Sequence, residues 1–265
     1  MFFTLSTWQL AILLTAITFG ATLLGLWAGR SLSVHKEHLH ESLGVVQGAL
    51  LTLVGLVLAF GLAMAVGRYD LRRDALVDEV NAITTSYLRA QTLHEPVRSR
   101  SLPLFRQYTT ASLDLSKSVP GTAAQQHAIE EGAVLQRRLW RLAGQSLAAA
   151  PEQSAPRLYV ESLNTMIDAR TTRVSALDNR VPSAFMLIEV IGVAVALGLL
   201  ALYVALFARG VVTVLLAAGL LTLLLFVSFD LDRPSRGFIK ITTAPLAELE
   251  QTVQLPPAAQ APGHP

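Results

Sequence analysis

Three histidines stand close together in one short stretch, where they could bind a metal ion. His35, His38 and His40 are interleaved with Glu37 and Glu41. Imidazole nitrogens are common ligands of zinc and copper. No secondary structure is secured in this stretch, so the spacing alone does not place the rings on a common face. A metal site and an ordinary solvated loop are therefore both open. We favour the loop, and we predict no metal site and no cofactor.

Adjacent acidic residues are a second candidate for chemistry. Asp78 and Glu79 follow each other directly, so on a helix their side chains point about 100° apart. That geometry is poor for an acid–base pair, and we expect ion pairs at the surface or between subunits, with Arg72, Arg73 and Arg89 as candidates. The sequence contains no nucleotide-binding loop, nucleophile elbow or HExxH motif. We predict that the protein is not an enzyme.

Glu189 is the one acidic residue inside a long apolar stretch. Acids within a membrane span are costly and often functional. However, Glu189 follows Pro182 by only seven residues, which is about two helical turns. An interfacial acid and a functional intramembrane acid are both compatible with this position.

The elements that must position these residues are hydrophobic helices. Hydrophobic residues make up 52% of the 265 residues and charged residues only 15%, against about a quarter charged in soluble domains. A bilayer core takes about 20 apolar residues in helical form. Four uncharged stretches reach or approach this length: Met1–Gly29, Ser42–Gly67, Val190–Ala208 and Gly210–Phe229. The sequence predicts an all-α integral membrane protein with four transmembrane helices, and the first is too long for a cleaved signal peptide.

Basic residues near the span ends indicate the orientation. One side offers three of them, Arg30, Lys36 and Arg209. The other side offers nine, which are Arg68, Arg72, Arg73, Arg170, Arg173, Arg180, Arg233, Arg236 and Lys240. Cytoplasmic loops carry the excess of Lys and Arg. We therefore predict a bacterial inner-membrane protein with both termini and the large insert in the cytoplasm.

The long insert between the second and third spans is expected to be helical. Leu76, Val80, Ile83, Tyr87 and Ala90 recur at steps of four and three, which predicts a seam for another helix. Further helices are expected over 104–117, 123–150 and 157–180, separated by proline and glycine. We divide the chain into a first transmembrane hairpin (1–67), the cytoplasmic helical insert (68–183), a second hairpin (184–229) and a cytoplasmic tail (230–265), disordered from about residue 254.

The second span carries a stripe of small residues. They are Gly44, Gly48, Thr52, Gly55, Ala59, Ala63 and Gly67, at steps of four with one step of three. Small residues at this spacing let helices approach closely in lipid. The contact could lie within one subunit or between subunits around an axis.

A row of bulky apolar residues lies beside this stripe. Leu53, Leu56, Phe60 and Met64 also recur at steps of three and four. Most such rows face lipid or a neighbouring helix. A ring of them around an axis would instead form a constriction that excludes water, which is one way that channels close.

Several segments together resemble a known family. They are Arg68–Arg73, Val77–Arg89, Asn164–Asp168, Asp230–Pro234, Gly237–Phe238 and Ala244–Leu246. As an ordered set they resemble the bacterial bestrophin-like membrane family, over roughly Gly44 to Leu246. The motif positions are Asp78, Glu79, Asn81, Asp168, Asp230, Asp232, Arg233 and Pro234.

The resemblance implies a four-span membrane protein with a helical cytoplasmic insert. A remote likeness to true bestrophins would further imply a pentameric ion channel with a hydrophobic neck on the second span, for which Leu56, Phe60 and Met64 are the candidates. True bestrophins carry a dense acidic calcium clasp after the fourth span. Here only Asp230 and Asp232 remain, next to Arg233, so calcium gating is not expected.

Two functions follow as hypotheses. The first is an oligomeric, bestrophin-like ion channel, with the lipid bilayer, further copies of the chain and inorganic ions as partners. The second is a non-conducting scaffold or sensor whose insert helices bind a cytoplasmic partner. The net charge of +2 is too small to indicate nucleic acid. For Arg233, both an anchor at the membrane boundary and a charge at a pore mouth are open.

Overall fold

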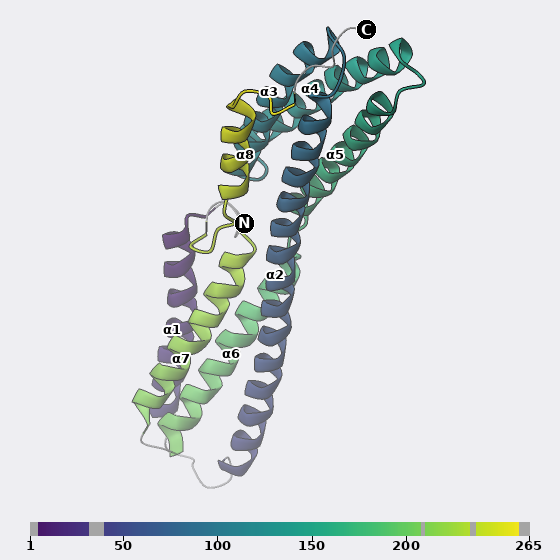
Figure 1. Ribbon diagram of the computed structural model, residues 1–265. Coiled ribbons are helices and arrows are strands. Elements are labelled where there is room, and N and C mark those ends of the chain that lie inside the picture. Colours follow the sequence, from purple (N-terminus) through teal and green to yellow (C-terminus); the bar gives the residue numbers. More distant parts are fainter. Residues whose placement is uncertain (1–4, 32–39, 208–209, 234–236, 260–265) are drawn as a thin grey trace. The chain divides into compact units, whose positions relative to one another are not determined.

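The computed structural model describes residues 5–31, 40–207, 210–233 and 237–259, and the side chains of 40–42 are not part of the description. Within these ranges the regular elements are all α-helices (Figure 1). They are α1 (Thr7–Ser31), α2 (His40–Ala90), α3 (Val97–Lys117), α4 (Ala123–Ala149), α5 (Ser154–Asp178), α6 (Ser183–Phe207), α7 (Val211–Leu231) and α8 (Ala244–Gln254). The all-α prediction is confirmed.

The chain forms two compact units. The span unit consists of Met1–Tyr69 and Arg180–Lys240, and the insert unit consists of Asp70–Asn179 and Ile241–Pro265. α2 contributes its first part to the span unit and its last part to the insert unit. The tail that follows α7 is divided as well, since its first residues belong to the span unit and α8 belongs to the insert unit.

The span unit contains α1, the first part of α2, α6 and α7 (Figure 1). By length and composition, the described chain has four helices that can cross a membrane, and helices suit this role because they satisfy their backbone hydrogen bonds internally. The prediction of four spans is confirmed. The core of this unit is apolar and includes Leu10, Leu14, Val54, Leu58, Val190, Val193, Leu197, Leu225 and Phe229.

A pair of glycines brings α1 and α6 close together. A Cβ added to Gly25 would lie 2.2 Å from the backbone oxygen of Gly198, and one added to Gly29 would lie 2.5 Å from Ala205 Cβ. The helices therefore touch through backbone, as small residues four apart allow in lipid. This contact was not predicted, although the Gly25–Gly29 spacing was visible in the sequence.

Replacing Gly25 with alanine should destabilise the span unit, because the added methyl group has no space beside Gly198. We expect a loss of about 1–3 kcal/mol, as for other overpacked sites, measured by thermal unfolding in detergent micelles. Gly20→Ala is the matched control on the same helix, since no described neighbour lies within 4 Å of that position. Equal melting temperatures for the two variants would contradict the close contact.

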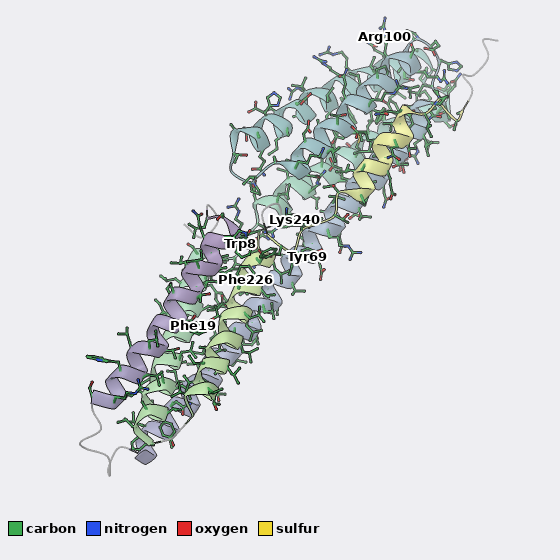
Figure 2. The ribbon with its side chains drawn as sticks, turned by 90° about the vertical axis from the view of Figure 1, so that its left-hand side faces the viewer. Trp8, Phe19, Tyr69, Arg100, Phe226 and Lys240 are labelled. Atoms are coloured by element: carbon green, nitrogen blue, oxygen red, sulfur yellow. The ribbon has the colours of Figure 1, made fainter. Side chains whose placement is uncertain are left out.

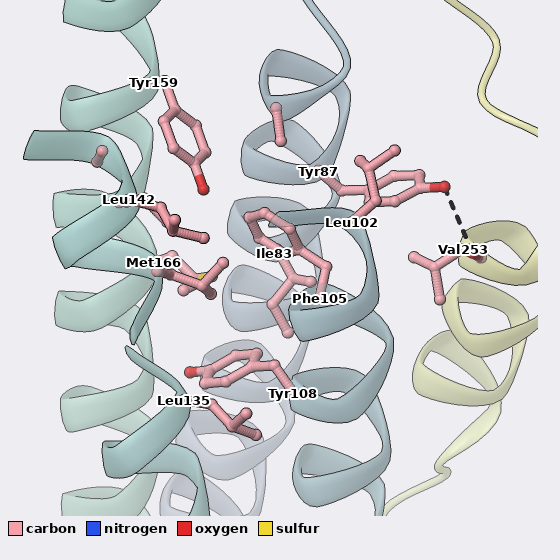
Figure 3. Close-up of a cluster of buried hydrophobic side chains, with 14 of the residues drawn as sticks. Ile83, Tyr87, Leu102, Phe105, Tyr108, Leu135, Leu142, Tyr159, Met166 and Val253 are labelled. Atoms are coloured by element: carbon pink, nitrogen blue, oxygen red, sulfur yellow. Dashed lines mark hydrogen bonds between the residues drawn. The ribbon is translucent and has the colours of Figure 1, made fainter. Parts of the chain in front are cut away.

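The insert unit is built around a buried aromatic cluster (Figure 3). Phe105 on α3 packs edge-on against Tyr87 of α2 and Tyr159 of α5, with ring centroids 6.0 and 6.4 Å apart. The predicted α2 seam is confirmed, because Leu76, Ile83, Tyr87 and Ala90 are buried and Val80 packs against the core.

Two helices of this unit begin earlier than predicted. α3 begins at Val97 and contains Pro103, where burial of Leu102 and Phe105 in the core outweighs the hydrogen bond that proline removes. α5 begins at Ser154. Pro156 lies in its first turn, where a missing N–H costs nothing.

α8 was not predicted at all. Leu246, Leu249 and Val253 recur at steps of three and four and are buried in the insert unit. The Tyr87 hydroxyl donates a hydrogen bond of 3.3 Å to the carbonyl of Val253 (Figure 3). α8 is therefore an integral part of this unit.

The chain beyond α8 is also fixed as far as Ala259. Gln91 Oε1 accepts from the Ala259 N–H at 2.9 Å, and Arg98 Nη2 donates to the Ala259 carbonyl at 3.0 Å. Residues 260–265 lie outside the described residues, and for them the predicted disorder stays a prediction.

Candidate functional site

The bulky row on α2 points away from the core of the span unit. Leu56 and Phe60 are 53% and 60% exposed, and Met64 is half-buried. Val54 and Leu58, on the opposite side of the same helix, are buried against the other spans. The three neck candidates therefore belong to a face that the described part of the chain leaves open.

The small-residue stripe lies on this open face as well. A Cβ added to Gly48, Gly55 or Gly67 would meet no described neighbour within 4 Å. Ala59 and Ala63 are exposed. Gly44 is the exception, because a Cβ added there would lie 3.4 Å from the Tyr203 ring of α6. From Gly48 onward the stripe lies open within the described chain, which argues against packing inside one subunit at those positions. What covers it must be lipid or another chain.

This face combines large side chains, such as Leu56 and Phe60, with a continuous strip of small residues. The other spans also expose large side chains, among them Ile12, Leu23, Leu24, Trp27, Ile188, Ile191, Val195, Val212, Leu216 and Leu220. A surface of Gly and Ala lets the backbone of another helix approach. The α2 face is therefore the candidate for contact with a further copy of the chain.

The motif after the fourth span ties three chain segments of the span unit together. Asp232 Oδ2 accepts from the Val181 N–H at 2.9 Å, before α6 begins. Asp230 Oδ2 accepts from the Ile239 N–H, also at 2.9 Å. The Arg233 guanidinium donates to the carbonyl of Leu5, ahead of α1. These contacts favour the anchoring role of Arg233 over a charge at a pore mouth.

Replacing Arg233 with glutamine should lower the level and the thermal stability of the protein, because Leu5 loses its charged donor. Arg233→Lys keeps the charge but not the planar fork, so we expect an intermediate stability. Expression level and melting temperature are the measurements. Unchanged stability together with an altered ion preference would instead support the pore-mouth role.

Aromatic side chains gather at the same end of the span unit. Phe238 packs against Trp8 and Phe226, with centroids 5.9 Å apart in each pair, and Lys240 lies close by (Figure 2). Tryptophan and basic residues concentrate at membrane–water interfaces. This end is therefore one boundary of the membrane-embedded region.

Three of the motif residues line one groove in the insert unit. Asp78 and Asn81 of α2 face Asp168 of α5 across a groove of about 530 Å³. Its other lining residues are Ala82, Thr85, Arg89, Glu161, Ser162, Thr165, Ala169 and Thr172. The structure thus brings together motif positions that are about 90 residues apart in the sequence. Among the described residues, no His, Asp and Glu side chains form a group of three that could hold a metal.

Glu79 is not at the surface, and the predicted ion pairs with Arg72, Arg73 or Arg89 are wrong for it. Its carboxylate is 0% exposed and pairs with Arg170 at 3.2 Å and with Arg173. Ser112 also donates to it at 2.8 Å. The charge count had assigned Arg170 and Arg173 to the membrane boundary, whereas their guanidinium groups lie in the core of the insert unit.

Two opposing effects set the pKa of Glu79. Burial alone would raise the pKa, but the charges of Arg173 and Arg170 outweigh it and hold the pKa below its usual value. The carboxylate is therefore ionised and forms a buried network with both guanidinium groups. Tyr108 contributes as well, with its ring 5.3 Å from the Arg170 guanidinium carbon, and burial raises the pKa of its hydroxyl.

A glycine makes room for this network. A Cβ added to Gly132 on α4 would lie 2.2 Å from Arg170 Nη2 and 2.4 Å from its Cζ. Arg170 Nη2 donates at 2.8 Å to the carbonyl of Ala128, one turn earlier on α4. The absence of a side chain at Gly132 therefore lets the Arg170 guanidinium lie directly against α4.

Arg72 serves a further role that the sequence did not reveal. It is buried, and it donates from Nε to the Ala176 carbonyl at 3.2 Å and from Nη2 to the Asn179 carbonyl at 2.6 Å. These are carbonyls at the end of α5, where a basic side chain stabilises the helix dipole.

Some predicted positions lie outside the described residues. They are Pro234 and the histidines His35 and His38, while only the backbone of His40 is described. The alternatives for the histidine stretch therefore remain as the sequence left them.

The comparison with known families agrees with this architecture. Residues 16–246 match the family described as the Bestrophin-like domain. The chain belongs to this family. The bestrophin-like resemblance seen in the sequence is therefore confirmed; the match ends at the predicted residue, 246, and begins earlier than predicted, at residue 16 in place of about residue 44.

Solved structures of bacterial bestrophins share the fold of this Bestrophin-like chain. Three crystal structures, each of a variant of a bacterial bestrophin homolog from Klebsiella pneumoniae, match with TM-scores of 0.64, 0.67 and 0.67. Their identities are 13%, 14% and 15%, and the matches cover 92% of this chain and 96%, 97% and 96% of theirs. No curated protein matches this sequence.

Proposed function

We propose that this Bestrophin-like protein is an oligomeric ion channel whose neck is formed by Leu56, Phe60 and Met64 of α2. The observation that carries the proposal is the open α2 face, where a bulky apolar row runs beside a strip of Gly and Ala. The small residues allow copies to pack closely. The bulky residues would then converge on the axis of the assembly.

A ring of such side chains suits a closed gate. Steps of four residues advance only about 40° around a helix, so the three side chains share one face. They offer an ion nothing to coordinate, and the ring therefore resists hydration. The solved bacterial bestrophin homologs share the fold, which supports the proposal at the level of architecture.

The location follows from the charge pattern. We place the protein in the bacterial inner membrane, with both termini and the insert unit in the cytoplasm, as the positive-inside rule indicates. A reporter fused after Pro265 that is active only in the cytoplasm is the expected result. We assign the protein no enzymatic reaction.

Oligomeric state and flux test the proposal together. We expect the protein in nanodiscs to be a closed ring of several copies and, after reconstitution into liposomes, to pass ions above the background of empty vesicles. The alternative is a non-conducting scaffold that binds a partner through its insert helices, and the family does not favour it. A monomer or dimer without flux would favour the scaffold over the channel.

A further inference from the structure

Glu189 lies buried in the span unit, and none of the described residues is a polar partner of its carboxyl group. Its side chain is 1% exposed, although α6 is an apolar helix in a membrane span. Within the described ranges, Oε1 accepts no hydrogen bond, and the carboxyl group takes part in none of the ion pairs. The sequence is compatible with an interfacial acid and with a functional intramembrane acid. The burial of Glu189 favours the intramembrane acid.

The carboxyl group is held directly against α2. A Cβ added to Gly61 would lie 1.8 Å from Glu189 Oε1, 2.7 Å from its Cδ and 3.0 Å from Phe185 Cε1. A methyl group at this position would displace the carboxyl group from where it lies. The contact is too close to admit a metal ion between the carboxyl oxygen and α2.

No counter-charge is available in the spans that surround it. The stretches 7–29 of α1, 43–67 of α2 and 211–229 of α7 contain no charged residue, and the only other titratable group in α6 is Tyr203. Arg68 follows Gly61 by seven residues, about 10 Å along the helix axis. Arg180 precedes α6, and Asp230 lies in the last turn of α7. The state of the carboxyl group is therefore set by its burial.

We propose that Glu189 is a proton-binding site inside the span unit and that the bound proton keeps α2 packed against α6. An ionised carboxylate without a partner is costly in a membrane span. A proton removes the charge and is the one ligand small enough for the space at Gly61. Loss of the proton leaves a negative charge at the contact, which draws in water and loosens α2.

The proton site is directly connected to the proposed neck through the backbone of α2. Gly61, which contacts the carboxyl group, follows Phe60 immediately. Release of the proton should therefore shift Phe60 and raise ion flux as the pH increases. This second step rests on the proposed channel function, whereas the binding of the proton does not.

Infrared difference spectroscopy of the protein in nanodiscs tests the site without any ion flux. We expect a carboxylic acid C=O band that fades with a single-proton titration between about pH 5 and pH 9, and that is missing in Glu189→Gln. Gly61→Ala should move this band or its midpoint, because the methyl group displaces the carboxyl. Gly219→Ala is the control, since no described atom lies within 4 Å of that position. A parent spectrum without a band that Glu189→Gln removes would overturn the proposal.

Liposome flux at several pH values tests the coupling. The parent protein should conduct several-fold more at high pH than at low pH, whereas Glu189→Gln should be low and independent of pH. A titrating band without flux from any variant would keep the proton site and refute the channel. Flux with the same pH dependence in the parent and in Glu189→Gln would refute the coupling.

Discussion

Replacing Phe60 with alanine should raise ion flux through the assembled protein about tenfold or more. Phe60 is the most exposed of the three neck candidates, and removal of its ring widens and wets an apolar constriction. A tenfold change corresponds to lowering the barrier by about 1.4 kcal/mol. Liposome flux at equal protein density is the measurement.

The matched control for this variant is Phe19→Ala. Phe19 is on α1, and its ring packs against the core of the span unit. The control substitution should lower stability and leave flux unchanged. Both samples must first be shown to assemble like the parent. Background flux in a fully assembled Phe60→Ala protein would mean that the α2 row faces lipid, and the channel proposal would then fail.

Replacing Glu79 with glutamine should destabilise the insert unit by about 3–5 kcal/mol. Removing one partner of a buried ion pair leaves the opposite charge uncompensated, and here two guanidinium groups lose their carboxylate. Thermal unfolding of the full-length protein, followed by circular dichroism, measures the effect. A loss below about 1 kcal/mol would contradict the buried network.

The same network gives the insert unit a defined pH dependence. The folded-state pKa of Glu79 lies below its ordinary value of 4.5. The stabilisation by Glu79 is therefore complete above the unfolded-state pKa and is lost as the pH falls through the folded-state pKa. Below about pH 4.5 the parent should lose stability more steeply than Glu79→Gln.

Two alanine substitutions on α4 give an independent check of the network. Gly132→Ala should be destabilising, because the methyl group collides with the Arg170 guanidinium. At Gly144 no described neighbour lies within 4 Å. There the same change should stabilise the helix by about 0.5–1 kcal/mol.

The sequence determined the helices and the spans well because their signals are local. Long uncharged stretches mark the four spans, and the seam at Ile83 and Tyr87 marks the buried face of α2. Both depend only on the order of residue types along one helix. The open α2 face with Phe60 was recognisable for the same reason, but its exposure needed the structure.

What escaped prediction depends on partners that are distant in the sequence. Glu79 lies between Leu76 and Ile83 on the buried face, so its burial was readable. Its partners Arg170 and Arg173 are about 90 residues away on α5, and nothing local indicates them. The same holds for Glu189 and Gly61. α8 was missed because its short apolar pattern lies in a segment that was assigned to the tail.

The contact between Gly25 and Gly198 has a consequence for how the protein is made. The two residues are about 170 positions apart, so α1 enters the bilayer long before α6 has been synthesised. Until then its glycine surface faces lipid or transient neighbours, since domains form as the chain emerges. The first segment of the insert unit, Asp70–Asn179, is translated during this interval, whereas α8 follows only after α6 and α7. Assembly of the membrane-embedded bundle is therefore a late event of biogenesis, and chains that terminate before α6 should be substrates for quality-control proteolysis.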